Sequence, residues 1–320
     1  MQDLRAPHLE EIRAARERLA GVTVRTPLVR LNVDDAPAEI WLKLENLQPI
    51  GSFKLRGAFN AMRLAEPERL AAGVYTASAG NMAQGVAWSA RQLGIPATVV
   101  VPDHAPATKI AAIERLGGKV VRVPFDRWWQ TLIEHSYPGL AGLFVHPVSD
   151  TAVMAGNGTI ALEILEDLPD VDAVFVPFGG GGLSCGIAAA LRALRPEVPV
   201  YGCEVSTATP LTASLAAGSA QACDHQPSFV DGIAGKSMLP EMWPLVSTLL
   251  AGARVAPLEA VAAAVRLLAE RNRIIAEGAG ATPVAAALAD SRGARKVVCI
   301  VSGGNIDAAK LCTILEGRVP

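Results

Sequence analysis

Lys54 lies in the stretch GSFKLRGA, where the sequence predicts the start of a helix. Leu55, Phe59 and Met62 follow at helical spacing and give this helix an apolar face. Ser52 is its predicted N-cap. A helix N-terminus carries partial positive charge and favours the neutral form of a lysine, which is a nucleophile and a base. The alternative is a surface lysine that tolerates its place, and this segment alone leaves both open.

Three loops that follow predicted strands contain small and polar residues. Ser78, Gly80 and Asn81 lie just before a helix, where free backbone N–H groups can bind a carboxylate. The run Gly179–Gly182 also precedes a helix, and consecutive glycines can wrap backbone N–H groups around a phosphate. Ser302 leaves a hydroxyl at the end of a strand. Taken singly, each loop is also typical of a tight connection.

The glycine run departs from both common nucleotide motifs. It has no third glycine where GxGxxG requires one, and it lacks the GK[ST] ending of a P-loop. A phosphate monoester is therefore favoured over a dinucleotide or a nucleoside triphosphate. An amine, a carboxylate site, a phosphate site and a strand-end hydroxyl together match the needs of one cofactor, pyridoxal phosphate.

These loops must be positioned by a framework in which strands and helices alternate. The β-branched runs that predict strands begin at Ile40, Gly73, Pro96, Lys119, Val171, Val198 and Lys296. Most are separated by Ala- and Leu-rich segments with helical periodicity. The pattern predicts an α/β fold with parallel sheets covered by helices on both faces, where ligands bind at the carboxyl ends of the strands.

Composition limits the partners of the chain. With 320 residues and 51% hydrophobic content, two domains are expected. The 29 Lys and Arg residues against 31 Asp and Glu residues give no basic excess for nucleic acid or a membrane surface. The charged N-terminus predicts an amphipathic helix and neither a signal peptide nor a membrane span. Five cysteines without a CxxC pair indicate reduced thiols and a cytoplasmic location.

Several motifs together resemble one enzyme family. GSFKLRGA, SAGNMAQGVA, AGNGTIALEIL, GGGGL, AEGAGA and SGGN occur in the order found in the serine/threonine dehydratase and serine racemase group of fold-type II pyridoxal-phosphate enzymes. The resemblance runs from about Thr26 to Asn305. It implies a two-domain fold similar to the tryptophan synthase β subunit, with the active site in the cleft between the domains. The small domain would comprise residues 51–148, and the large domain residues 1–50 and 149–320.

The resemblance also implies roles for individual residues. Lys54 would form the Schiff base with the cofactor and later take the Cα proton. Phe53 would lie beside the ring, Asn81 would bond its hydroxyl oxygen, Ser302 would face its nitrogen, and Glu277 would lie near the cofactor. The phosphate would be held by Gly179, Gly180, Gly181, Gly182 and Leu183. The substrate would be bound by Ser78, Ala79, Gly80, Asn81 and Met82.

The implied activity is dehydrative deamination of a hydroxy amino acid of the threonine or serine type, giving a 2-oxo acid and ammonia. The alternatives are a dehydratase for another substrate, such as phenylserine or hydroxyaspartate, and a racemase. A non-enzymatic alternative is a phosphate-ligand binding protein, although it would have no use for the Lys54 amine. The resemblance implies that racemases of this group have a second serine at the position of Ala79, which returns a proton to the opposite face of Cα, so Ala79 favours elimination. A homodimer acting on a small amino acid is expected.

Two further positions differ from the family pattern. Met82 stands where a histidine is usual, which makes the predicted site more apolar unless the residue contributes only its backbone N–H. Glu204 resembles the first ligand of the racemase cation site, but Pro210 falls where a second carboxylate is expected. Because proline cannot coordinate a cation, no metal is expected.

Overall fold

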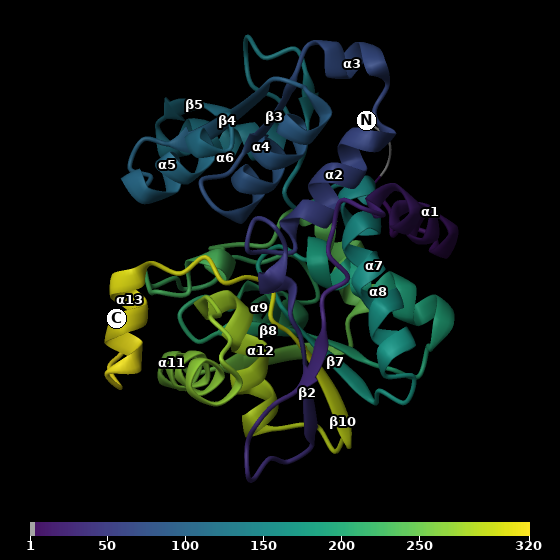
Figure 1. The fold of residues 1–320 in the computed structure, drawn as a ribbon, viewed down its shortest axis with the longest axis vertical. Coiled ribbons are helices and arrows are strands. Elements are labelled where there is room, and N and C mark those ends of the chain that lie inside the picture. The colour runs from purple at the N-terminus through teal and green to yellow at the C-terminus, as the bar shows by residue number, and fades with distance from the viewer. Residues whose placement is uncertain (1–3) are drawn as a thin grey trace.

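Two β-sheets form the frame of the structure, a computed structural model that describes residues 4–320 (Figure 1). The six-stranded sheet has the order β1 (Leu28–Arg30), β2 (Glu39–Lys43), β10 (Lys296–Ile300), β7 (Ala173–Pro177), β8 (Val200–Val205) and β9 (Gly252–Ala256). The four-stranded sheet has the order β5 (Gly118–Val123), β4 (Ala97–Pro102), β3 (Val74–Ala77) and β6 (Leu143–Phe144). Neighbouring strands pair in parallel, except that β1 is antiparallel to β2.

Helices cover both sheets. In the first half of the chain they are α1 (Leu9–Leu19), α2 (Lys54–Leu64), α3 (Pro67–Ala71), α4 (Asn81–Leu93), α5 (Ala107–Arg115), α6 (Phe125–Glu134) and α7 (Thr151–Asp167). They continue with α8 (Gly182–Leu194), α9 (Pro210–Ala217), α10 (Trp243–Leu249), α11 (Leu258–Leu267), α12 (Gly278–Ala289) and α13 (Ala308–Leu315). Short 3-10 turns span Glu45–Leu47, Asp231–Ile233 and Pro240–Met242, and a π-helical segment, Leu268–Asn272, follows α11. Across residues 4–320, no helix combines the length and apolar character needed to cross a bilayer.

All seven strands predicted from β-branched runs are present, as β2, β3, β4, β5, β7, β8 and β10. The predicted N-terminal helix is α1. The sequence analysis missed β1, β6 and β9. The first two have only three and two residues, too few for a periodic pattern. In β9, Gly252 and Arg254 interrupt the apolar run.

Two apolar cores lie on the two faces of the six-stranded sheet. Val174 and Val176 of β7 belong to the core formed with α7 and α8, whereas Phe175 between them belongs to the core formed with α11 and α12. This alternation follows because successive side chains of a strand point to opposite faces. β7 is therefore buried on both sides, as expected for a central parallel strand.

The four-stranded sheet has separate apolar clusters and lies with α4, α5 and α6 at the top of Figure 1. Its strands fall between Val74 and Phe144, and every strand of the larger sheet lies outside that range. We therefore propose the domain limits expected from the sequence, with residues 51–148 as the smaller domain. Helix α2 lies where the two parts meet.

Close helix packing fixes the position of α2. A Cβ atom at Gly156 of α7 would lie 2.3 Å from the carbonyl oxygen of Arg56, and one at Gly85 of α4 would lie 3.2 Å from that of Lys54. Only glycine permits the first contact, and a larger residue at the second would press on the backbone of Lys54. Helices α4 and α7 therefore hold the first turn of α2 from two sides.

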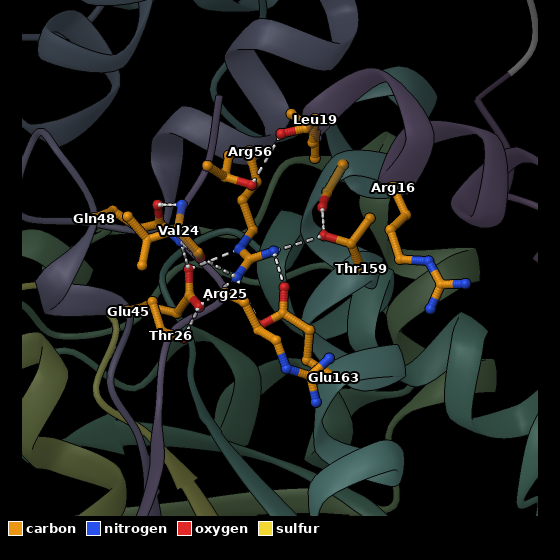
Figure 2. Close-up of polar contacts among 12 residues, drawn as sticks. Arg16, Leu19, Val24, Arg25, Thr26, Glu45, Gln48, Arg56, Thr159 and Glu163 are labelled. Carbon is orange, nitrogen blue, oxygen red and sulfur yellow. Dashed lines mark hydrogen bonds and ion pairs between the residues drawn. The ribbon is translucent and has the colours of Figure 1, made fainter. Parts of the chain in front are cut away.

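A buried cluster of charges anchors the same helix (Figure 2). Arg56, with an exposed fraction of 1%, donates to Glu45 at 2.8 Å and to Glu163 at 2.6 Å. Lys43 also contacts Glu163 and donates to the carbonyl oxygen of Thr26 at 2.6 Å. Burial raises the pKa of Glu45, but the charge and hydrogen bonds of Arg56 outweigh this effect and leave it below its usual value. Two cations and two carboxylates thus balance in the buried interior.

The cluster predicts a large penalty for removing its central cation. Arg56→Met leaves the Glu45 carboxylate buried without its cation, so we expect the free energy of unfolding to fall by about 3–5 kcal/mol in urea titrations. The matched control is Arg266→Met, which removes an exposed pair with Glu270 and should cost about 0.5 kcal/mol or less. Equal losses in the two variants would contradict the assigned role of the buried cluster.

Candidate active site

The loop that follows β10 holds the start of α2 through backbone hydrogen bonds. The N–H of Phe53 donates to the carbonyl oxygen of Ser302 at 3.0 Å, and the N–H of Gly304 donates to that of Gly51 at 2.9 Å. Gly51 has φ +71, and its αL conformation lets the chain turn into α2 beside this loop. Two segments about 250 residues apart in sequence are thereby joined at the carboxyl end of β10.

Ser52 is not the N-cap that the sequence predicted. Phe53 occupies the N-cap position, and α2 has no side-chain cap. Ser52 instead pairs with Gly303 as an isolated bridge residue. Its hydroxyl is buried and has no hydrogen-bond partner within residues 4–320. The prediction failed because the bridge to Gly303 fixes the backbone of Ser52 before α2 begins.

Lys54 lies partly buried at the first position of α2. Its Nζ atom donates to the carbonyl oxygen of Pro147 at 2.8 Å and lies 5.0 Å from the centre of the Phe53 ring. Burial lowers the pKa of Lys54 to about 8, against an opposing effect of the Glu277 carboxylate. A substantial neutral fraction therefore exists near pH 8, as nucleophilic or base chemistry requires.

Glu277 links Asn81, a predicted site residue, to the loop that follows β10. Its Oε1 atom accepts from Nδ2 of Asn81 at 2.8 Å, and Oδ1 of Asn81 accepts from Asn305 at 2.8 Å. The N–H of Glu277 donates to the carbonyl oxygen of Gly303 at 3.0 Å. Burial raises the pKa of Glu277 to about 7, and the charge of Asp231 adds to the shift. The structure thus brings the first turn of α4, the start of α12 and the loop after β10 together beside Lys54.

The predicted carboxylate loop leads directly into α4. Ser78 Oγ accepts from the N–H of Gly80 at 3.2 Å, and Ala79, Gly80 and Asn81 are all partly exposed. Helix α4 has no side-chain cap, so the backbone N–H groups of its first turn remain free for an anion.

Met82 differs from its neighbours in this loop. Its side chain is 1% exposed and packs in the core of the smaller sheet with Val86 and Val153. We infer that its contribution to a ligand site is confined to the backbone N–H.

The glycine run forms the entry to α8. Gly181 is the N-cap with φ +99, and no side chain caps the helix. A Cβ atom at Gly180 would lie 2.8 Å from either methyl group of Val148, and one at Gly182 would lie 2.8 Å from the Val148 carbonyl oxygen. Leu183 is buried in the first turn. The loop therefore presents free backbone N–H groups, has no space for side chains at these two positions, and fits an anion such as a phosphate.

The turn from His146 to Ser149 was missed by the sequence analysis. It supplies Pro147, the acceptor for Lys54, and Val148, which packs against the glycine loop. A backbone carbonyl carries no residue signature, and a lone histidine without metal-ligand spacing is ordinarily structural. The histidine–proline pair was the only signal in this segment, because β6 before it is too short to be recognised.

Glu204 has a structural role at the start of α9. Its buried carboxylate accepts from the N–H of Leu211 at 2.6 Å and from the N–H and hydroxyl of Thr212 at 2.9 and 2.7 Å. Pro210 is the first residue of that helix. Within residues 4–320, no group of three or more His, Cys, Asp and Glu side chains is arranged to hold a metal ion.

The low pKa of Lys54 predicts selective reactivity. In protein freed of any bound cofactor, acylation of Lys54 followed by peptide mass spectrometry should rise with pH around a midpoint near 8. Exposed Lys119 provides an internal reference for the reagent. Glu277→Gln removes a negative charge that favours the ammonium form, so the midpoint should fall further. A higher midpoint in this variant would contradict the assigned electrostatics.

The chain is similar to known proteins over most of its length. Residues 19–303 match the family described as pyridoxal-phosphate dependent enzyme. The L-threonine ammonia-lyase of Thermotoga maritima is 42% identical over 314 residues, which cover 96% of this chain and 78% of that protein.

Solved structures show the same architecture. Maize serine racemase superimposes with a TM-score of 0.90 at 31% identity, covering 98% of each chain. The processed form of threonine deaminase isoform 2 from Solanum lycopersicum gives a TM-score of 0.86 at 33% identity, covering 96% of this chain and 93% of that one. The α/β fold and the cofactor expected from the sequence motifs are thereby confirmed, and the chain belongs to the family of pyridoxal-phosphate dependent enzymes.

Proposed function

We propose that the chain is an ammonia-lyase that converts a β-hydroxy amino acid of the threonine or serine type into a 2-oxo acid and ammonia. The observation that carries this proposal is the Lys54 amine, held at the start of α2 with its pKa lowered to about 8 and bordered by Glu277. The similarity to the L-threonine ammonia-lyase of Thermotoga maritima supports the same reaction class.

The residues present fit pyridoxal phosphate. Lys54 offers an amine for the aldehyde, and the free N–H groups at the start of α8 offer a site for the phosphate. Asn81 and Ser302 would face the ring hydroxyl and the ring nitrogen. When bound, pyridoxal phosphate withdraws electrons from the Cα atom of an amino acid joined to its aldehyde. A neutral serine hydroxyl does not force protonation of the ring nitrogen, which favours prompt loss of a β-substituent.

The protein groups would divide the remaining tasks. Ser78 and the backbone N–H groups of residues 79–82 would bind the substrate carboxylate at the N-terminus of α4. The Lys54 amine, once free, would take the Cα proton as general base, because a pKa of about 8 leaves part of it unprotonated near neutral pH. The neighbouring Glu277 carboxylate would stabilise the ammonium that results.

Ala79 distinguishes elimination from racemisation. A racemase needs a proton donor on the second face of Cα, and an alanine side chain has no proton to give. The structural similarity to maize serine racemase therefore reflects the shared fold, and we propose that elimination dominates. We also propose that the enzyme acts as a homodimer, which sedimentation analysis would test.

The activity predicts one dominant product and one indispensable residue. L-threonine and L-serine, incubated with the loaded enzyme in deuterated water, should yield 2-oxo acid at least tenfold faster than the D isomer, as measured by chiral chromatography. Faster formation of D-serine than of pyruvate would favour the racemase alternative.

Lys54→Ala should lose activity by more than a thousandfold while it remains folded, because both amine roles disappear.

The glycine loop predicts a specific loss of cofactor affinity. Gly181→Ala places a side chain at φ +99, in the loop that would hold the phosphate. We expect the dissociation constant for pyridoxal phosphate, measured by equilibrium dialysis, to rise at least tenfold. Gly218→Ala provides the matched control, because Gly218 has φ +69 with open space around it. An equal change in the two variants would show that backbone strain alone, and not the phosphate site, is responsible.

A further inference from the structure

His146 closes a turn that neither the motifs nor the proposed reaction uses. Its ring is 2% exposed, and Nδ1 accepts from the backbone N–H groups of Val148 at 3.0 Å and Ser149 at 2.7 Å. Both bonds require an unprotonated Nδ1. Burial lowers the pKa of His146 well below its usual value, and the charges of His135 and Lys54 act in the same direction. The ring is therefore a neutral acceptor that fixes two consecutive backbone amides.

The turn held by His146 contacts two separate parts of the cofactor site. The Pro147 carbonyl oxygen, directly after His146, accepts from the Lys54 amine at 2.8 Å. The next residue, Val148, fills the space that side chains would take at Gly180 and Gly182, with both of its methyl groups 2.8 Å from a Cβ atom built at Gly180. A shift of this turn would therefore move the acceptor of the amine and the support of the glycine loop together.

We propose that His146 is a positioning residue of the cofactor site. Its neutral ring holds residues 147–149 and, through them, fixes the Lys54 amine and the glycine loop relative to each other. This inference rests on the cofactor site proposed above and adds a residue that does not itself touch the cofactor. The competing interpretation is a core histidine that contributes only to stability.

A second histidine completes the arrangement. The ring of His135 stacks on that of His146, with centroids 4.4 Å apart and an interplanar angle of 20°. Its Nε2 atom lies 3.4 Å from Ser149 Oγ and 3.8 Å from a carboxylate oxygen of Glu241. His135 has φ +53 at the end of α6, and it accepts no hydrogen bond from the backbone of residues 147–149. It therefore serves as a matched control for loss of an aromatic ring at the same place.

The experiment compares three variants of the full chain. His146→Leu removes the acceptor at similar volume, and His146→Asn restores an oxygen near the position of Nδ1. His135→Asn removes the stacked ring with a residue that tolerates positive φ. For each variant, pyridoxal phosphate affinity is measured by equilibrium dialysis, and amide exchange at residues 148 and 149 is followed in the cofactor-free protein. Thermal unfolding of that protein reports stability separately.

We expect His146→Leu to weaken pyridoxal phosphate binding at least tenfold and to speed exchange of the two amides. His146→Asn and His135→Asn should stay within about threefold of the wild-type affinity. A folded His146→Leu with unchanged affinity, or an equal loss in His135→Asn, would overturn the proposal and leave a purely structural role. Failure of the wild-type chain to bind the cofactor would instead contradict the cofactor site itself.

Val148→Ala keeps the test decisive if His146→Leu does not fold. This variant removes the two methyl groups beside Gly180 and leaves the backbone amide that donates to His146. We expect its affinity for pyridoxal phosphate to fall about three- to tenfold while exchange of the amides at 148 and 149 stays slow. Unchanged affinity in folded Val148→Ala would show that the turn does not support the glycine loop, and the proposal would be wrong.

Discussion

The site depends on the fixed position of the first turn of α2. The backbone of residues 302–304 holds the segment before it, and two glycines on α4 and α7 let those helices approach the backbone of Lys54 and Arg56. A lysine on a mobile loop would be hydrated and fully charged. Held between packed helices, Lys54 loses solvation, and its pKa falls into the range where the amine can act as a base.

The buried charges on α2 serve a different purpose from the reactive lysine, although only one residue separates them. Arg56 has carboxylates on two sides and stays ionised, whereas Lys54 has a carbonyl oxygen as its hydrogen-bond partner and Glu277 as a neighbouring charge. Burial acts against the charge of both residues. The guanidinium of Arg56 is intrinsically too basic to lose its proton, and the two carboxylates stabilise its buried charge. The Lys54 amine has no such direct pair, so burial makes it a titratable group.

Glu277 occupies an intermediate position in this electrostatic arrangement. Its own pKa is raised to about 7 by burial, so its charge near neutral pH is set by the same desolvation that lowers the pKa of Lys54. The two groups oppose the shifts of each other, and Asn81 donates to the carboxylate and helps keep it ionised. Asn81 therefore connects the carboxylate loop of α4 to the protonation of the lysine.

Local sequence patterns were enough to predict seven strands alternating with helices, the position of Lys54 at a helix start and the glycine run before a helix. The strands and helices follow from local periodicity, and few structures other than a loop of exposed backbone N–H groups require a run of glycines. The family motifs then predicted which residues belong to one site. Strands of two or three residues, such as β6 and β1, carry too little pattern to be recognised.

Other details of the site depend on long-range contacts that no local pattern encodes. In the folded chain Phe53 occupies the N-cap position of α2, and the side chain of Met82 packs in the core of the smaller sheet. The Pro147 carbonyl oxygen accepts the hydrogen bond of Lys54. The fold also stacks the ring of His135 on that of His146, which lies eleven residues further along the chain. Backbone hydrogen bonds and long-range packing depend on which segments of the chain come into contact. A local pattern of residue types does not specify those contacts.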